Sequence, residues 1–401
     1  YITVNLKDTP APFAMTCAAK GEAIENTVYR LTLEAGTLVL EDKRSARRIT
    51  SLFSLEDCAD AGDSYDFSPL AGDEPTRCAH FTLIDCSKTP LCQTMVLEAV
   101  MSLPPDLAGR RENTRTPLSM RIVCELRHDD PNLHVDSSLV NSHCDHRLRL
   151  LINSDICTRH SLASQPFSII ERKTGYDDTH WQERYREKPV DIETSEGIIA
   201  IAQAGKALVV NSRGMKEFQV IGRDPAVIAL TLFKSTGVLG RSDLDWRPGR
   251  ASGINNTVVD TPDAQLLKPL HFSFTVALAD NADHLTLRQL ENQATGHPFT
   301  YQRQTLHTLD NRLERFSLRL PERTLPAEFS LFALPEPLVL SALPHAQRSP
   351  GTIARVFNAG TQPVPVPAGL AERPQLNYLE EHVPSVTTIP PSATCDFLIE
   401  A

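Results

Sequence analysis

The chain has 401 residues, of which 41% are hydrophobic and 22% charged, so it can build a sizeable core and two or three domains. Its formal net charge is −10 and no stripe of Lys and Arg stands out, which argues against nucleic acid as a partner. Neither an apolar run long enough to span a bilayer nor a signal-peptide pattern is found, so we expect no membrane partner.

The cysteine content bears on the compartment. There are nine cysteines, an odd number, and no two of them form a CxxC pair. We therefore expect reduced thiols in a cytoplasmic protein. The chain starts at Tyr1 rather than at Met, and we expect it to be a piece of a longer protein.

A hydrophobic period of two residues dominates the first 280 positions. Residues 29–34 alternate, Ala35-Gly36 is a turn signal, and residues 37–40 resume the alternation, which predicts a β-hairpin. Further short strands are predicted at 94–100, 119–126, 133–140, 148–152, 197–201, 207–210, 218–221, 227–232 and 270–277. A sheet with one apolar face must cover it, so these strands predict a large antiparallel β-sandwich.

One short helix is predicted near residue 290. Capping residues stand at 281–283, and Leu285, Leu287, Leu290 and Ala294 follow at roughly helical spacing. The run Gly296-His297-Pro298 ends the pattern.

A small second β domain is predicted after this helix. The proline-flanked run 320–326 marks a boundary, and short strands are predicted beyond it at 329–333, 339–342, 352–358, 375–379 and 395–399. The predicted organisation is therefore a linker over residues 1–22, a large β-sandwich domain over 23–322 and a small C-terminal β domain over 323–401.

An acidic segment at residues 56–67 is the first candidate for chemistry. Five carboxylates fall within eleven residues, an oxygen-rich pattern that could bind Ca²⁺, although the spacing is not that of an EF-hand. A sugar-facing loop is a second interpretation, because carboxylates accept hydrogen bonds from hydroxyls and Tyr65 adds a donor and a stacking face. A solvated turn is the third.

A second cluster of metal-ligating residue types lies at 143–146. In a strand, His143 and His146 would point to opposite faces, and no second pair of ligands follows at suitable spacing. We therefore predict a structural cluster rather than a metal site, with Asp145 and Arg147 on one face and able to pair.

The third candidate is a segment rich in Gly and Arg at residues 237–253. It lacks the Lys-Ser/Thr ending of a phosphate-binding loop. Arg241, Arg247 and Arg250 could bind a polar ligand or a neighbouring domain, and a plain loop is an equal alternative. No Ser-His-Asp order, HExxH or GxSxG pattern can be defended.

Taken in order along the chain, these segments resemble glycoside hydrolase family 38, the α-mannosidases. The matches to family patterns are residues 24–43 (IEN…GTLxLxDK), 56–69 (EDxxDxGDxYxxSP), 145–149 (DHRLR), 166–172 (FxVxER), 210–218 (NxGLPEYEV), 230–241 (LTLLRSVGxLxR) and 377–381 (NLLEE). Seven collinear matches are far more specific than one, and they cover only the family's C-terminal half.

The resemblance implies the all-β region of a retaining α-mannosidase. The family's zinc and carboxylate nucleophile belong to an N-terminal barrel, so no catalytic residue and no metal ligand is assigned in this chain. The sandwich is expected to lend Tyr65 and Arg241 to the sugar pocket, with Arg247 and Arg250 as competitors. The resemblance further implies that Asp60 and Asp63 order the loop. Lys234 replaces the family's usual Arg.

Within the family, the details resemble bacterial enzymes that hydrolyse mannosylglycerate. An Arg-rich loop would suit a carboxylate-bearing aglycone. The implied partners are an α-mannoside and the chain's own N-terminal barrel. Two alternatives stay open: a stand-alone carbohydrate-binding module, disfavoured by 6% aromatic residues and two tryptophans, and an oligomerisation platform such as a homodimer.

Overall fold

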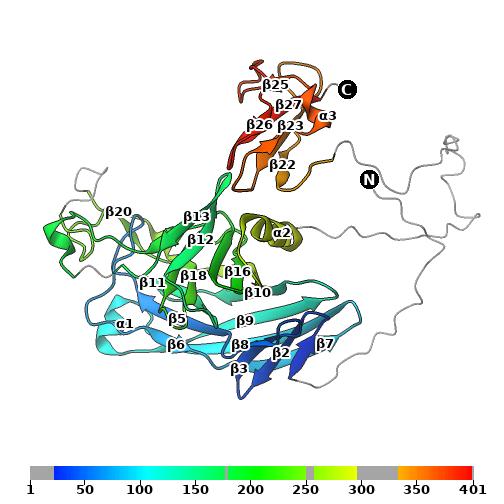
Figure 1. Cartoon of the computed structure of the whole chain (residues 1–401). Helices are drawn as coiled ribbons and strands as arrows, with labels where there is room; N and C mark the ends of the chain where they lie inside the picture. The colour runs from blue at the N-terminus through cyan, green and yellow to red at the C-terminus, as the bar shows by residue number, and fades with distance from the viewer. Residues whose placement is uncertain (1–21, 177–178, 250–256, 296–332, 400–401) are drawn as a thin grey trace, which may run out of the picture. The chain divides into compact units, whose positions relative to one another are not determined.

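The computed structural model describes residues 22–176, 179–249, 257–295 and 333–399 (Figure 1). These residues fall into two compact units, one ending at residue 294 and one starting at 333. The predicted linker, apart from Glu22, and the predicted boundary at 322/323 lie outside the described residues. In the part of the chain that is described, no helix has the length and apolarity needed to cross a membrane.

The first unit opens with a small sheet that contains the predicted hairpin. Its four strands pair in chain order: β1 (Ala23–Glu25), β2 (Tyr29–Glu34), β3 (Thr37–Asp42) and β4 (Arg47–Ile49). Ala35 and Gly36 both have positive φ, 47° and 81°, as a tight turn between twisted strands requires. The hairpin is confirmed at the predicted residues.

The largest sheet has nine antiparallel strands in the order β13-β12-β15-β16-β21-β10-β9-β8-β7. Their bounds are β7 Thr82–Lys88, β8 Cys92–Leu103, β9 Thr116–Arg127, β10 Leu133–Val140, β12 His160–Gln165, β13 Ser168–Lys173, β15 Ile198–Gln203, β16 Lys206–Asn211 and β21 Pro269–Ala279. All of its predicted strands are present, and several are longer than the sequence pattern indicated.

A six-stranded sheet has the order β14-β17-β18-β11-β5-β6. Its strands are β5 Phe53–Ala59, β6 Thr76–Cys78, β11 His146–Asn153, β14 Ile192–Thr194, β17 Glu217–Ile221 and β18 Val227–Lys234. A two-stranded ribbon pairs β19 (Val238–Leu239) with β20 (Val259–Asp260). Short 3₁₀ turns lie at Trp181–Glu183 and Pro262–Gln265.

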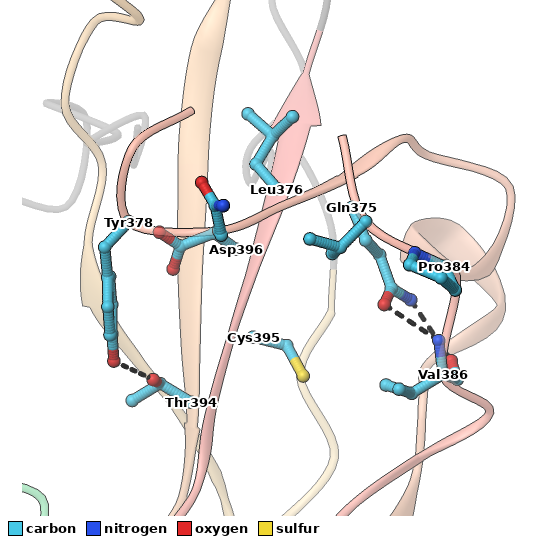
Figure 2. A pocket seen from close by; sticks show the side chains of 10 residues that line it. Gln375, Leu376, Tyr378, Pro384, Val386, Thr394, Cys395 and Asp396 are labelled. Carbon is cyan, nitrogen blue, oxygen red and sulfur yellow. Dashed lines mark hydrogen bonds between the residues drawn. The ribbon is translucent and has the colours of Figure 1, made fainter. Parts of the chain in front are cut away.

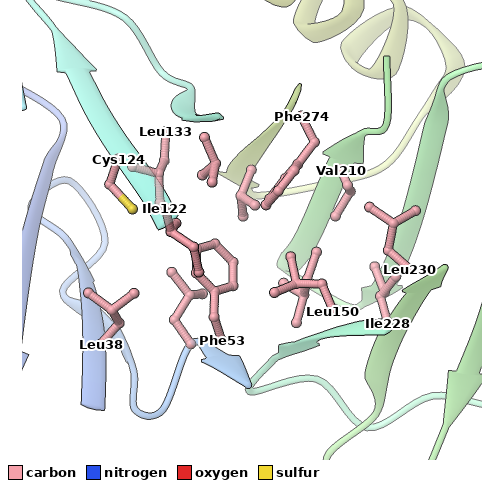
Figure 3. Packing of buried hydrophobic residues seen from close by; sticks show 14 of the residues in the cluster. Leu38, Phe53, Ile122, Cys124, Leu133, Leu150, Val210, Ile228, Leu230 and Phe274 are labelled. Atoms are coloured by element: carbon pink, nitrogen blue, oxygen red, sulfur yellow. The ribbon is translucent and has the colours of Figure 1, made fainter. Parts of the chain in front are cut away.

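The core lies between the nine-stranded and six-stranded sheets. Figure 3 shows its buried side chains pointing toward one another from both sides. Phe53 of β5 meets Phe274 of β21 edge to face, with ring centroids 5.8 Å apart. Leu150 and Val210 belong to the same cluster. Because the two sheets supply alternating inward residues, the predicted β-sandwich is confirmed.

Helix α2 (His284–Thr295) confirms the predicted helix. Asp283 caps it, because the Asp283 carboxylate accepts a 2.8 Å hydrogen bond from the backbone N–H of Thr286. Leu287 and Leu290 pack with Val209 in a second apolar cluster on the nine-stranded sheet. The six-residue helix α1 (Leu107–Glu112) was not predicted, because it is too short to show a helical period.

The C-terminal unit has its own core. A four-stranded sheet in the order β22-β23-β27-β25 and a β24-β26 pair are joined by one short helix. The bounds are β22 Leu338–Ala342, β23 Thr352–Asn358, β24 Val364–Pro365, α3 Ala368–Ala371, β25 Gln375–Leu376, β26 Thr388–Ile389 and β27 Thr394–Ile399. The predicted strand 375–379 is shorter than expected, because a turn with Glu380 at φ 60° follows. The predicted strand 329–333 lies outside the described residues except for Ala333.

Acid should weaken the first unit through Asp155. Burial alone would raise the pKa of this carboxyl, but hydrogen bonds from Arg47 and Lys206 lower it from 3.8 to about 2. A carboxyl with a depressed folded-state pKa stabilises the fold above its unfolded pKa, so a contribution of about 2 kcal/mol is lost as pH falls from about 4 to about 2.

Urea unfolding between neutral and acidic pH checks this expectation. Asp155→Asn should remove that part of the acid dependence, whereas the exposed Asp245→Asn should keep it. An Asp155→Asn protein with the acid profile of the unmodified chain would contradict the assignment.

Candidate functional site

The candidate site is a cleft of about 490 Å³ in the first unit, which we call the acidic-loop cleft. It is bordered by residues from the acidic segment, the Arg-rich segment, the stretch 187–194 and strands β17 and β18. The lining residues are Ser64, Tyr65, Asp66, Phe67, Ser68, Glu187, Lys188, Val190, Ile192, Glu193, Thr194, Glu217, Lys234, Leu244, Trp246 and Arg247.

The acidic loop begins where β5 ends. The backbone N–H of Asp60 donates to the carbonyl of Asp145 at 2.9 Å, which continues the pairing of β5 with β11 by one bond. The buried Asp60 carboxylate then accepts from the N–H groups of Gly62 (2.9 Å) and Ser68 (3.2 Å). Burial raises the pKa of Asp60, and Lys234, 3.6 Å away, opposes that shift. The Asp60 carboxylate therefore links the beginning of the acidic loop to its end.

Asp63 joins the acidic loop to the Arg-rich loop. One carboxylate oxygen accepts from the N–H groups of Tyr65 and Asp66 at 3.0 and 3.1 Å. The other accepts from the N–H of Arg241 at 2.8 Å and from the guanidinium of Arg247 at 2.7 Å. Burial alone would raise the pKa of Asp63, but Arg247 and the backbone donors hold it below its ordinary value. Asp63 is thus an ionised buried anchor for both loops.

Arg247 is the cation of this junction. It is 6% exposed, and besides Asp63 it contacts the Asp66 carboxylate and donates to the carbonyl of Arg241 at 2.9 Å. Its guanidinium also lies 5.8 Å from the centre of the Tyr65 ring. Because most of its donors are already used within the protein, Arg247 orders the cleft wall as well as lining it.

Aromatic side chains form part of the cleft surface. Tyr65 is 50% exposed, so its hydroxyl and ring face are accessible. Trp246 packs edge to face on Phe67 with centroids 5.4 Å apart, and the Lys188 ammonium lies 4.4 Å from the centre of the Trp246 ring. Aromatic faces beside charged groups suit a ligand with both apolar and hydroxyl surfaces, as a sugar has.

Charged groups from other strands complete the lining. Glu217 accepts a 2.6 Å hydrogen bond from the Thr231 hydroxyl, and the Lys234 ammonium donates to the carbonyl of Asp63 at 2.9 Å. Burial raises the pKa of Glu193, although Arg172 lies 3.1 Å from its carboxylate. The cleft can therefore both donate hydrogen bonds to hydroxyl groups and accept them.

The structure brings some of the predicted site residues together. Tyr65 and Arg247 line the cleft. Arg241 is outside that lining and donates to the carbonyl of Ala61 at 2.7 Å, so its side chain braces the acidic loop. Arg250 lies outside the described residues.

Sequence reasoning missed the residues that come from the segment 187–194 and from β17. Glu193 and Glu217 reach the cleft from two paired strands, since β14 pairs with β17 and Glu193 lies opposite Phe218. No local motif marks either carboxylate, and Lys188 belongs to an irregular stretch. Only a predicted pairing of β14 with β17 could have indicated that these residues reach the cleft. Such a pairing could not be predicted, because β14 has only three residues.

The acidic segment 56–67, whose first four residues belong to β5, does not present a set of free ligands for Ca²⁺. Its carboxylates already face the protein's own cations: Glu56 faces Arg149 and Arg77, Asp57 faces Arg110 and His146, and Asp63 and Asp66 face Arg247. In the described parts of the chain, no group of three His, Cys, Asp or Glu residues is arranged to hold a metal ion. The eight described cysteines are free thiols.

One expectation about the histidine cluster is wrong. His143 and His146 do not diverge: their ring centroids are 5.9 Å apart, because β11 begins only at His146 and Asp145 before it has φ 51°. Asp145 does not pair with Arg147 either. Its carboxylate accepts from the Gln265 amide at 2.8 Å, while Arg147 lies over the ring of Phe67.

A smaller hollow of about 270 Å³ lies in the C-terminal unit. Figure 2 shows the Tyr378 hydroxyl against Thr394 and the Gln375 amide bonded to the backbone of Val386. Asp396, its charged lining residue, already forms a two-bond ion pair with Arg355. The acidic-loop cleft therefore offers far more chemistry than this hollow.

Comparisons with known proteins place these features in a family context. Residues 24–238 match the model described as "Glycosyl hydrolases family 38 C-terminal domain". The protein named "Putative mannosylglycerate hydrolase" of Halalkalibacterium halodurans is 23% identical over an alignment of 286 positions, which covers 66% of this chain and 29% of the relative.

Two solved structures from Enterococcus faecalis resemble the fold. An alpha-mannosidase matches with a TM-score of 0.75 and 21% identity over 97% of this chain and 43% of its own. A protein in glycosyl hydrolase family 38 matches with a TM-score of 0.71 and 18% identity over 97% of this chain and 45% of its own. The chain thus spans less than half the length of each of these relatives.

Proposed function

Because this chain belongs to glycoside hydrolase family 38 through its C-terminal domain, we propose that it is the β-sandwich region of a cytoplasmic retaining α-mannosidase. In this proposal the acidic-loop cleft completes the sugar pocket of a catalytic barrel that is not among these residues. The observation that carries the proposal is the junction of Asp63 and Arg247, which presents the half-exposed Tyr65 at the cleft.

The role proposed for the cleft is to hold sugar hydroxyls. Tyr65 offers a phenol to a hydroxyl, Trp246 offers a stacking face, and Glu217 offers an acceptor. Arg241 acts through the loop that it braces. Because these groups bind rather than break bonds, the chain alone is expected to lack hydrolytic activity.

The reactive groups are proposed to lie elsewhere. The family resemblance implies a zinc ion that would polarise the reacting centre, and two carboxylates with a covalent glycosyl intermediate. The described residues do not fit a zinc site, because the carboxylates of the acidic loop are engaged by Arg, Lys and His side chains. In this proposal the described residues hold the sugar and take no part in breaking the glycosidic bond.

The substrate is proposed to be an α-mannoside, with mannosylglycerate as the specific candidate. Support comes from the name of the Halalkalibacterium halodurans relative and from two lysines in the cleft lining, Lys188 and Lys234, which suit a carboxylate-bearing aglycone. Hydrolysis of mannosylglycerate and of an aryl α-mannoside by the full-length enzyme, measured side by side, tests the choice. Turnover of the aryl substrate alone would reject mannosylglycerate.

A stand-alone carbohydrate-binding module is the second candidate, because Tyr65 and Trp246 share one cleft. Calorimetric titration of the chain with mannose separates the two. The proposal predicts weak or no binding by the chain alone, and hydrolysis only when the barrel is joined. Turnover of an aryl α-mannoside by the pure chain would overturn it.

Tyr65→Phe in the full-length enzyme should lower the hydrolysis rate while leaving the melting temperature unchanged. Loss of one neutral hydrogen bond, about 0.5–1.5 kcal/mol, corresponds to roughly a two- to tenfold decrease in kcat/KM. Tyr176→Phe is the matched control, because Tyr176 is 60% exposed and outside the cleft lining. An unaltered rate for Tyr65→Phe would remove Tyr65 from the sugar site.

A further inference from the structure

The ring of His146 has a hydrogen-bond acceptor at each nitrogen. Nδ1 lies 2.5 Å from a carboxylate oxygen of Asp57, and Nε2 lies 3.1 Å from the side-chain oxygen of Asn141. The ring is 1% exposed and Asp57 is fully buried, so water cannot take the place of either partner. A neutral imidazole carries only one N–H and would leave one of these contacts without a proton.

The orientation of the Asn141 amide is fixed independently of His146. Its nitrogen donates to the carbonyls of His143 and Gln265, both at 3.0 Å, and its oxygen accepts from the backbone N–H of His143 at 3.1 Å. A flipped amide would point its oxygen at two carbonyl oxygens. Nε2 of His146 therefore faces an acceptor and must carry a proton.

The charge on Asp57 is fixed from its other side. Its second oxygen contacts the guanidinium of Arg110, which also lies 3.1 Å from the Asp73 carboxylate. Two carboxylates, those of Asp57 and Asp73, thus share one buried guanidinium. One additional proton held between Asp57 and His146 brings the net charge of the cluster to zero. Because Arg110 favours the ionised form of Asp57, that proton belongs on Nδ1 of His146.

Two further rings lie close to that of His146. Phe233 of β18 packs edge to face at 5.1 Å, and the neighbouring His143 ring is 5.9 Å away. Burial lowers the pKa of His143, and the charge of His146 lowers it further, so His143 is the uncharged member of the pair. His143 is held instead by the Thr116 hydroxyl, 2.9 Å from its Nε2.

This cluster lies where both loops of the acidic-loop cleft begin. The carbonyl of His146 accepts from the N–H of Ser235, the first residue after β18, at 2.8 Å. The preceding carbonyl, that of Asp145, accepts from the N–H of Asp60, the first residue after β5. The ring itself bridges β5 through Asp57 and β18 through Phe233.

We propose that His146 is a positioning residue that carries a proton on both ring nitrogens in the folded protein, and that its ion pair with Asp57 fixes the starts of the acidic and Arg-rich loops. The importance of this role for sugar recognition rests on the proposed function. The charge state of His146 and its loop contacts are independent of the proposed function.

The protonation state is measured on the unmodified chain by NMR with ¹⁵N-labelled histidine at neutral pH. We expect both ring nitrogens of His146 at the similar shifts of an imidazolium, and one nitrogen of His143 at the distinct shift of an unprotonated ring nitrogen. Loss of one signal pair in His146→Gln provides the assignment. A neutral pattern for His146 would overturn the proposal, whatever the protein does with sugars.

The positioning role is measured through Trp246, which lies beside Arg247 in the Arg-rich loop. Trp181→Phe makes Trp246 the sole tryptophan, and excitation at its long-wavelength absorption edge avoids the tyrosines. In that background His146→Gln should shift the emission to longer wavelength and increase acrylamide quenching, whereas His143→Gln should leave both unchanged. Emission and quenching equal to those of the Trp181→Phe parent would refute the role. If His146→Gln does not fold, the ring signals of His146 are assigned by through-bond correlation with its own backbone, and the NMR result on the unmodified chain still decides the charge state.

Discussion

Asp63→Asn is expected to lower the free energy of unfolding by about 3 kcal/mol, because it leaves the buried Arg247 guanidinium with only the half-exposed Asp66 carboxylate as its anion. The Asn side chain keeps the shape but offers one neutral oxygen in place of a carboxylate that accepts from four backbone N–H groups and one Arg. Urea unfolding measures the loss, and Trp246 fluorescence shows whether the two loops separate.

The matched control is Asp66→Asn. Asp66 contacts the same guanidinium, but its side chain is 50% exposed, so its removal should cost no more than about 1 kcal/mol. Equal losses for the two variants would contradict the buried anchor.

Acid gives a second check on Asp63. Because the pKa of Asp63 is held below its ordinary value, its stabilisation is present at neutral pH and is lost as pH falls through the folded-state pKa. The stability difference between Asp63→Asn and the unmodified chain should therefore shrink in acid. A difference that stays constant down to the acid transition would show that the charge of Asp63 is not what stabilises the junction.

Phe53→Ala is expected to cost about 3–5 kcal/mol, because it opens a cavity between the two main sheets. Phe53 is fully buried, its ring meets Phe274 across the sandwich, and its strand β5 leads directly into the acidic loop. The midpoint of urea unfolding reports the loss.

Phe167→Ala makes the same chemical change at the turn between β12 and β13, where the side chain is 37% exposed. Its effect should stay within about 1 kcal/mol. If both Phe variants unfolded at the same urea concentration, the ring pair would not be central to the core.

Strands such as β9 and β10 were predictable from sequence because each buries one face more than the other, so apolar residues recur at every second position. The stretch 133–140 was predicted exactly as β10. Helix α1 and strand β14 were not predictable, because elements of six and three residues are too short to show a hydrophobic period.

The candidate site was predictable only in part. Tyr65 and the arginines were found because they belong to segments with unusual composition. Glu193, Glu217 and Lys188 reach the cleft through strand pairing and loop packing, which no local pattern encodes. The two histidines were misjudged because the strand period was extended back to His143, three residues before the point where β11 starts.

The ion pair between Asp63 and Arg247 joins residues that are 184 positions apart in the sequence. Such a contact cannot form until the intervening chain has folded, since closing so long a segment early would cost entropy with nothing to offset it. The cleft should therefore mature late in folding, after the hairpins and the sandwich interior. A refolding experiment would see the Trp246 environment recover in a slower phase than the β-sheet circular dichroism signal.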